Sequence, residues 1–128
     1  MNIGEAAKAS GVNAKLIRHY ESIGIVPKAS RSEAGYRKYS DTEVNILIFV
    51  RRSRSLGFSM KEIKKLVGLW RNKSRSSAEV KALAATHIAE LEKKITELEA
   101  IAKTLKQLSK NCRGDNRPDC PILEGLSG

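Results

Sequence analysis

The feature that most restricts the fold is a stretch from residue 77 to residue 110 without proline or glycine, in which apolar side chains recur at alternating steps of four and three. This spacing predicts a long α-helix with a heptad seam. A helix of about 34 residues is about 50 Å long, whereas a compact 75-residue body has a radius of gyration of about 11 Å. Since the helix extends beyond what its own chain can cover, a homodimer is the simplest arrangement, and folding back over its own domain is the alternative. The seam consists of Ala84, Ile88, Leu91, Ile95, Leu98, Ala102 and Leu105.

Positive charge is concentrated in the first part of the chain, whose formal net charge is +10. Residues 1–75 contain 16 Lys and Arg against 6 Asp and Glu, whereas residues 76–128 contain 8 of each and are neutral. A basic module joined to a neutral one is typical of a chain that binds a polyanion at one end and does something else at the other. A merely soluble basic surface is the alternative that charge alone leaves open.

Length and composition narrow the fold class further. The chain has 128 residues, which is room for one small domain with an appendage. Aromatic residues make up 5% and charged residues 30%, a balance typical of helical surfaces, so we expect a mainly α fold. No apolar run reaches the roughly 18 residues of a membrane span, and the first residues lack the pattern of a secretory signal. We therefore expect a cytoplasmic protein with no membrane partner and with free thiols.

The segment from Ile3 to Tyr20 predicts two short helices that meet at a glycine. Ala6 and Ala7 share one helical face, Gly11 interrupts it, and Asn13 can cap a second helix. The spacing from Ala7 through Gly11 to Ile17 fits a helix-turn-helix. The crossing of the two helices needs a small side chain, the turn tolerates glycine, and the second helix must bury an aliphatic residue.

A wing and two further helices are predicted after the helix-turn-helix. Residues 27–39 have a turn signal at Ala34-Gly35 and no helical period, which favours a short two-stranded ribbon. Gly57 is expected to end the first of the two helices that follow. Each of them starts at a capping box, formed by Ser40 with Glu43 and by Ser59 with Glu62.

The outward side of the second helix and the wing carry cationic and aromatic residues. Arg and Lys neutralise phosphates, and Tyr hydroxyls position a nucleic-acid backbone. Any one of these residues is more simply a solvated surface residue, but their joint occurrence favours a surface for double-stranded DNA. The predicted DNA-binding residues are Lys15, Arg18, His19, Tyr20, Arg31, Tyr36, Arg37 and Lys38.

No catalytic constellation is visible. The only histidines, His19 and His87, are not near a cysteine in sequence, and neither a phosphate loop nor a nucleotide fingerprint is present. We therefore expect no enzymatic activity.

Cys112 and Cys120 form the other chemical feature. A loop of this length can bring two thiolates together. Soft thiolates favour Cu(I), and two ligands suffice for a linear monovalent site, whereas structural zinc usually takes four. Buried thiols without a ligand and a reversible disulfide are the alternatives.

Four segments and the tail of the chain resemble a known family. The order and the residues of these segments resemble the MerR family of winged-helix regulators. The segments are Ile3-Gly-Glu-Ala-Ala, Leu16-Ile-Arg-His-Tyr-Glu, Gly35-Tyr-Arg-Lys-Tyr and Gly57-Phe-Ser-Met-Lys-Glu-Ile. The tail from Cys112 to Cys120, followed by Pro-Ile-Leu-Glu-Gly-Leu-Ser-Gly, resembles its copper-efflux regulator branch.

The resemblance implies an organisation in three parts. These are a winged helix-turn-helix DNA-binding domain at 1–75, a dimerisation helix at 76–110 that forms an antiparallel coiled coil, and a metal-binding loop with a short C-terminal helix at 111–128. It also implies that Lys15, Arg18, Tyr20 and Arg37 touch DNA, largely its backbone.

In that branch the two loop thiolates, here Cys112 and Cys120, hold the metal near the start of the partner's long helix. Copper-type members have Ser at this start and divalent-metal members have Cys; this sequence has Ser77. The resemblance therefore implies Cu(I), with Ag(I) and Au(I) as mimics.

The implied function is a copper-responsive activator of efflux and detoxification genes. It distorts a promoter so that RNA polymerase can read it. A divalent-metal or thiol-redox sensor of the same family is one alternative, and a copper-buffering or delivery protein is another.

Overall fold

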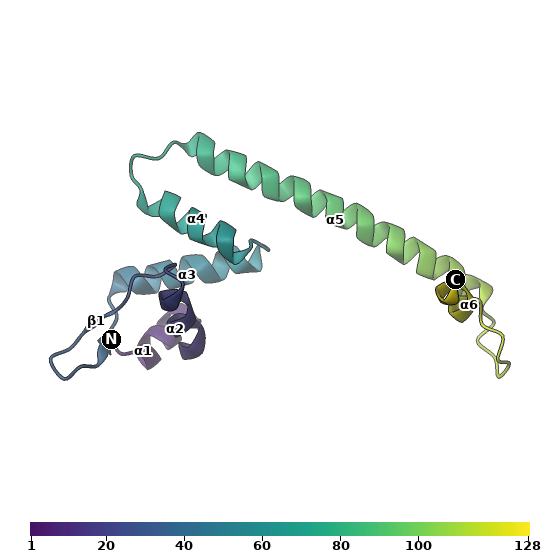
Figure 1. The fold of residues 1–128 in the computed structure, drawn as a ribbon, viewed down its shortest axis with the longest axis horizontal. Coiled ribbons are helices and arrows are strands. Elements are labelled where there is room, and N and C mark those ends of the chain that lie inside the picture. Colours follow the sequence, from purple (N-terminus) through teal and green to yellow (C-terminus); the bar gives the residue numbers. More distant parts are fainter. The chain divides into compact units, whose positions relative to one another are not determined.

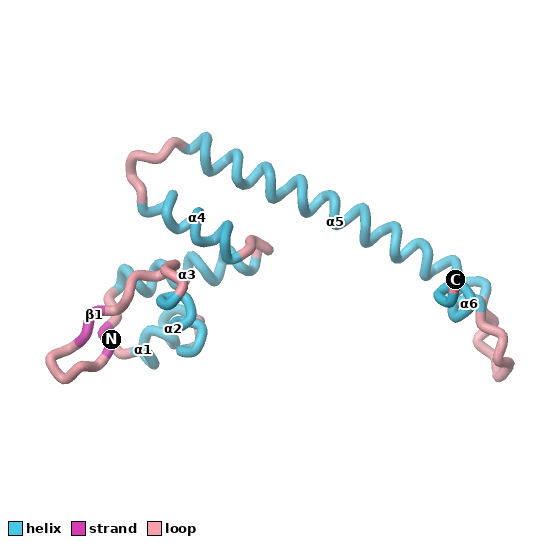
Figure 2. Tube along the Cα trace, viewed as in Figure 1, coloured by secondary structure: helices cyan, strands magenta, loops and turns pink.

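The computed structural model describes residues 1–128 and is dominated by helices, with one small two-stranded sheet (Figures 1 and 2). The predicted mainly α fold is confirmed. Residues 1–80 and residues 81–128 form two compact units. None of the helices combines the length and the apolar composition that crossing a membrane demands. The elements are α1 (Ile3–Ser10), α2 (Ala14–Ser22), β1 (Ser30–Arg31), β2 (Arg37–Lys38), α3 (Asp41–Ser55), α4 (Met60–Arg71), α5 (Ser77–Asn111) and α6 (Pro121–Ser127).

The helix-turn-helix forms where the sequence predicts it. Gly11 has a φ of 76°, a left-handed conformation that favours glycine, and its N–H donates to the carbonyl oxygen of Ala7 at 2.9 Å. Asn13 then caps α2 by accepting a hydrogen bond from the N–H of Leu16 at 2.8 Å. The inner face of α1 differs slightly from the expected one, because Ala6 is fully buried whereas Ala7 is half-buried.

The predicted wing is an antiparallel pair of two-residue strands, β1 and β2. Ser30 lies opposite Lys38, and Arg31 lies opposite Arg37. The turn between them uses Gly35, whose φ is 85° and whose N–H donates to the carbonyl oxygen of Ser32 at 2.9 Å. The wing is thus a short ribbon that carries polar side chains.

The core of the molecule lies within residues 1–80, where α3 lies between α1 and α4 (Figure 1). Both capping boxes are present at the starts of these helices, and Ser59 accepts a hydrogen bond from the N–H of Glu62 at 3.2 Å. Residues from all four helices and from the loops between them fill the core. The buried apolar residues are Ala6, Val12, Ile17, Tyr20, Ile25, Val26, Tyr39, Val44, Ile46, Leu47, Val50, Ile63 and Val67.

The seam of α5 is largely exposed in the single chain. Its large apolar side chains are between 37% and 64% exposed, and Ile101 joins the residues expected from the heptad pattern. These side chains are Ile88, Leu91, Ile95, Leu98, Ile101 and Leu105.

The short helix α6 packs closely against the last turns of α5. A Cβ atom at Gly125 would lie 2.6 Å from Cδ2 of Leu108, so glycine permits this approach. Leu123 and Leu126 of α6 are 65% and 69% exposed. The end of the chain therefore also presents apolar surface.

Candidate nucleic-acid interface and thiol pair

The outward face of α2 carries three exposed polar residues, Lys15, Arg18 and His19. Because a helix turns by about 100° per residue, these three side chains share one face, while Ile17 is fully buried on the opposite side. The face is available for an external partner, as the sequence predicts.

The wing brings further cationic groups to one edge of this face. Arg18 of α2, Arg31 of β1 and Arg37 of β2 line a hollow of about 280 Å³ together with Tyr36, which is 75% exposed. Arg31 donates from Nη1 to the carbonyl oxygen of Gly35 at 2.9 Å, which holds its guanidinium over the turn. Three guanidinium groups around one hollow can bind a phosphate by charge-assisted hydrogen bonds.

A buried carboxylate joins the end of α2 to the wing. The side chain of Glu21 accepts hydrogen bonds from the hydroxyl of Tyr39 and from the N–H of Ala29, the latter at 3.5 Å. Its Oε1 also lies 4.0 Å from Nη1 of Arg37. The sequence analysis missed Glu21, which is 7% exposed and fixes the wing relative to α2.

The buried position of Tyr39 controls its protonation. Burial, and then the hydrogen bond to the carboxylate of Glu21, raise the pKa of the Tyr39 hydroxyl above its ordinary value. The hydroxyl therefore stays protonated at neutral pH and remains a donor to Glu21.

Tyr20 lies on the inner side of α2. The spacing of Leu16, Ile17 and Tyr20 predicts this position, which is confirmed, because Tyr20 is 2% exposed and belongs to the core. Its hydroxyl accepts a hydrogen bond from Nη1 of Arg54 at 2.8 Å. Any contact of Tyr20 with DNA is therefore restricted to this hydroxyl.

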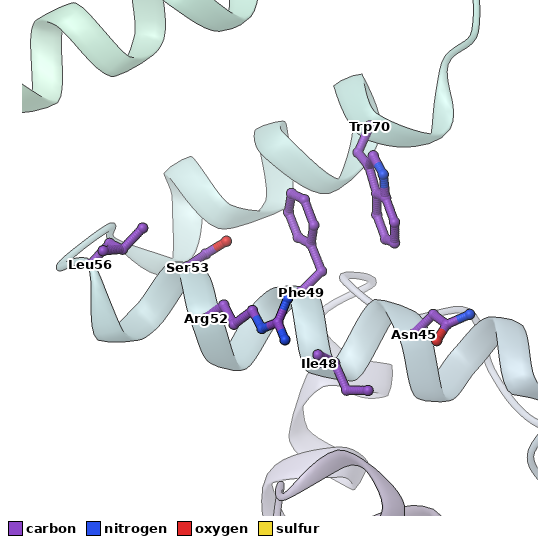
Figure 3. A pocket seen from close by; sticks show the side chains of 7 residues that line it. All are labelled: Asn45, Ile48, Phe49, Arg52, Ser53, Leu56 and Trp70. Carbon is purple, nitrogen blue, oxygen red and sulfur yellow. The ribbon is translucent and has the colours of Figure 1, made fainter.

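A further hollow, of about 410 Å³, lies between α3 and α4 and is lined mainly by apolar side chains (Figure 3). Phe49 stacks on Trp70 there, with ring centroids 4.5 Å apart and planes 8° from parallel. Arg52 also lines it. None of the residues predicted to bind DNA or metal contributes to this hollow.

The two cysteines are brought together at the end of α5. Their Sγ atoms lie 3.8 Å apart, and both side chains are half-buried thiols. Cys112 directly follows α5, while Cys120 precedes Pro121, the first residue of α6, so the ends of two helices hold the loop between them. The predicted proximity of the two sulfurs is confirmed.

The first turn of α6 acts on the thiol of Cys120. A hydrogen bond from the backbone of Leu123 is the main cause that holds the pKa of this thiol below its usual value, and burial opposes it. The thiolate form, which is both the nucleophile and the soft metal ligand, is thereby favoured.

Ser77 and the two cysteines do not share a site within one chain. Ser77 is the exposed first residue of α5, and Cys112 follows the last one. A helix of 35 residues is about 52 Å long, and it separates Ser77 from Cys112 along the chain.

Comparison with known families identifies the protein's relatives. Residues 1–68 match the family model of MerR helix-turn-helix regulatory proteins, and residues 44–108 match that of the MerR DNA-binding region. The chain belongs to the MerR family. The family consists of DNA-binding regulators, in agreement with the expectation that the chain is not an enzyme.

Several MerR-family relatives are similar over nearly the whole chain. Heavy metal-dependent transcription regulator 2 of Rhizobium meliloti is 55% identical over 99% of this chain and 86% of its own length. The regulator CueR of Escherichia coli O157:H7 is 42% identical over 100% of this chain and 95% of its own.

Among solved structures, the lead(II) complex of the transcription regulator PbrR691 from Ralstonia metallidurans CH34 superposes with a TM-score of 0.87 at 34% identity, covering 98% of both chains.

Proposed function

We propose that this MerR-family chain is a Cu(I)-responsive transcription regulator that binds promoter DNA as a homodimer in the cytoplasm. The observation that supports it most directly is the 3.8 Å separation of the Cys112 and Cys120 sulfurs, in a chain that also contains a basic helix-turn-helix. The relatives include regulators described as heavy metal-dependent and two described as CueR, which supports metal sensing in general and copper in particular.

The thiol pair fits a monovalent soft ion. If both sulfurs bonded an ion in a straight line at about 2.3 Å, the length of a zinc–thiolate bond, they would lie about 4.6 Å apart, so they need to move by less than about 1 Å. No histidine, carboxylate or further thiol of the chain completes a three-ligand group with these sulfurs. Two soft ligands suit Cu(I), with Ag(I) and Au(I) as mimics, better than zinc, which usually takes four ligands.

The exposed seam of α5 supports the homodimer. Antiparallel pairing of two α5 helices would bring the first turn of one, where Ser77 lies, to the end of the other, where the cysteines lie. A serine hydroxyl is a poor substitute for a thiolate at such a position, and the free N–H groups of a helix start favour a site that carries negative charge. This arrangement favours a two-thiolate Cu(I) site over a divalent one.

The DNA surface would comprise Lys15, Arg18 and His19 of α2, the hydroxyl of Tyr20, and Arg31, Tyr36, Arg37 and Lys38 of the wing. Two such surfaces in a homodimer would bind a palindromic site.

Activation of transcription by Cu(I) requires two conformations of the dimer on DNA. The activating conformation must bind the ion more tightly than the repressing one, since an equal affinity shifts no equilibrium. Because α6 starts directly after Cys120, joining Cys120 to Cys112 changes how α6 can pack. The activating conformation would distort the promoter so that RNA polymerase reads it, and the regulated genes would serve copper efflux.

The test is transcription in vitro by RNA polymerase from a promoter that contains the selected binding site, under buffered metal and reducing conditions that exclude a disulfide. We expect Cu(I) and Ag(I) to activate wild type and Zn(II) to have no effect. Ser77→Cys should reduce the preference for Cu(I) and Ag(I) over Zn(II), because it adds a third soft ligand. Strong activation of wild type by Zn(II) would contradict the monovalent assignment, and activation by an oxidant alone would favour a thiol-redox sensor.

A further inference from the structure

A basic hollow of about 460 Å³ lies between α4 and the loop that follows α2. Lys64, Gly68 and Arg71 of α4 line it, and the core residues Ile25 and Val67 lie at its bottom. We call it the α4 hollow. None of the residues predicted to bind DNA or metal lines it, so neither of those sites accounts for it.

Gly68 lies inside α4, three residues before the helix ends at Arg71. Glycine in the interior of a helix is destabilising relative to alanine, because glycine loses more conformational freedom on folding. Within the chain nothing requires glycine here, since its φ is not positive and a Cβ at Gly68 would have no heavy atom within 4 Å. Gly125 differs, because a Cβ there would meet Leu108. The bare surface of α4 at Gly68 is therefore open to a partner outside the chain.

Two cations flank this bare surface. With a rotation of about 100° and a rise of about 1.5 Å per residue, Lys64, Gly68 and Arg71 lie within about 60° of arc, and Lys64 and Arg71 are about 10 Å apart along the helix axis. Both cations are exposed, and neither forms an ion pair with a carboxylate. Nζ of Lys64 donates to the carbonyl oxygen of Ile23 at 3.2 Å, which holds the ammonium at the edge of the hollow. The α4 hollow therefore has a positive potential that suits an anionic partner.

A protein segment with carboxylates fits the α4 hollow better than a phosphate group does. Inside a helix the backbone N–H groups bond within the helix, and the carbonyl oxygen of Gly68 accepts from the N–H of Asn72 at 3.1 Å. A phosphate would thus find no free donor by approaching Gly68, and it could reach the long side chains of Lys64 and Arg71 without a bare helix surface. A partner helix would gain van der Waals contact at Gly68 and charge pairs on both sides of it.

We propose that the α4 hollow binds an acidic helical segment of RNA polymerase when the regulator and the polymerase occupy the same promoter. The partner helix crosses α4 at Gly68 and places carboxylates beside Lys64 and Arg71. The inference rests on the proposed function, which brings the polymerase next to the regulator on one DNA molecule, and adds a direct protein contact to it.

The test separates polymerase binding from folding and from DNA binding in full-length variants. A labelled promoter duplex that contains the selected site is first saturated with regulator, and the affinity of purified RNA polymerase holoenzyme for this complex is then measured. The variants are Gly68→Ala, Gly68→Gln and the double variant Lys64→Glu/Arg71→Glu. Lys65→Glu is the matched control, because it reverses an exposed charge on the same helix without lining the hollow.

We expect Gly68→Gln and the double variant to weaken polymerase binding by about tenfold, and Lys65→Glu to change it by less than about twofold. Affinity for the duplex without polymerase should stay at the wild-type value. Gly68→Ala and Gly68→Gln should raise the midpoint of thermal unfolding by about 4 °C, measured by the fluorescence of Trp70, the only tryptophan. A purely structural role of Gly68 would instead lower this midpoint when the glycine is replaced.

Contrary outcomes separate the inference from the proposed function. If wild type, Gly68→Gln and the double variant bind polymerase equally, the α4 hollow is not a docking surface, while activation of wild type by Cu(I) still supports the proposed function. If the double variant loses affinity for the duplex alone and binds polymerase like wild type, the hollow binds DNA and the inference is wrong. If wild type selects no duplex, both the inference and the proposed function are wrong.

Discussion

Residues 1–80 and residues 81–128 differ in how far they bury their own apolar side chains. Every buried apolar residue of the core lies between Ala6 and Val67, in the first unit. In the second unit, six large apolar side chains of α5 are 37% to 64% exposed. The excess of positive charge lies in residues 1–75, and the rest of the chain is neutral.

The difference shows which part of the molecule can form without a partner. The first unit closes its core within one chain, whereas the second leaves six large side chains of α5 for another surface. Completing the burial of a half-exposed Leu or Ile contributes about 1 kcal/mol, so the two seams of a homodimer contribute on the order of 10 kcal/mol before the cost of association. This gain is comparable with the cost of association, so we expect the seam to be an interface between two chains. The predictions below probe this division between the units.

The largest effect is expected from the thiol pair. Cys112→Ser or Cys120→Ser should abolish the response to Cu(I), because a two-coordinate site cannot lose one thiolate and keep its ligand set. Binding of the metal-free protein to its duplex should be unchanged, since the DNA surface lies in the first unit. Transcription under buffered Cu(I) and anisotropy with the duplex measure the two properties. Induction retained by either variant would refute the metal assignment, and lost DNA binding would show that the units are not separable.

The next effect concerns the exposed seam. Leu98→Asp places a charge among apolar side chains in the paired state, and we expect the dissociation constant of the dimer to rise by about 100-fold or more, equivalent to about 3 kcal/mol. Analytical ultracentrifugation measures it. Lys93→Asp introduces the same side chain on the opposite side of α5 and should leave the dimer intact. If Leu98→Asp remains a dimer at the concentrations at which wild type is a dimer, another surface joins the chains.

A smaller effect is expected at the DNA surface itself. Arg18→Ala and Arg37→Ala should each weaken binding by about tenfold, or about 1.4 kcal/mol, through lost phosphate contacts. For wild type, about 8 neutralised phosphates would give a slope of log K against log salt near −7, and each variant should reduce its magnitude. Dimerisation and metal affinity should stay at wild-type values. A wild-type slope near zero, or tight binding to a scrambled duplex, would argue against the DNA surface.

Local signals in the sequence predicted the elements well because their causes lie within a few residues. Asn13 caps α2 through the N–H three residues later, and Ser59 and Glu62 form their capping box over the same interval. Gly11 and Gly35 occupy the left-handed positions that the turns require. Such contacts are encoded by spacing alone, so a pattern is enough to find them.

The parts that the sequence did not predict depend on contacts between distant residues. Tyr20 meets Arg54 34 positions later, and Glu21 meets Tyr39 18 positions later. A helical projection of α2 places Tyr20 on the inner side, but only the position of α3 brings Arg54 to its hydroxyl. A hollow of about 240 Å³ beside α2, which Arg51 and Arg54 of α3 line, has the same origin, since it forms only where α3 packs beside α2.

The smallest effect tests whether the second unit is prepared for its ligand before binding. With Cys112→Ser, Cys120 is the only thiol, and the hydrogen bond from the backbone of Leu123 holds its pKa below the usual value. Cys120 should therefore stay a reactive thiolate as pH falls below that usual value, and lose reactivity only below its own depressed pKa. The pH profile of the iodoacetamide reaction should have a lower midpoint in the folded protein than in denaturant.

A matched pair of variants assigns the cause of this shift. Leu123→Pro removes the N–H donor at a position in the first turn of α6, where proline is tolerated, and should raise the midpoint. Leu123→Ala keeps the N–H and should leave the midpoint unchanged. If the folded and denatured midpoints coincide, or if both Leu123 variants shift the midpoint equally, α6 does not lower the pKa of Cys120. The two units would then differ in their core and charge but not in a preformed thiolate site.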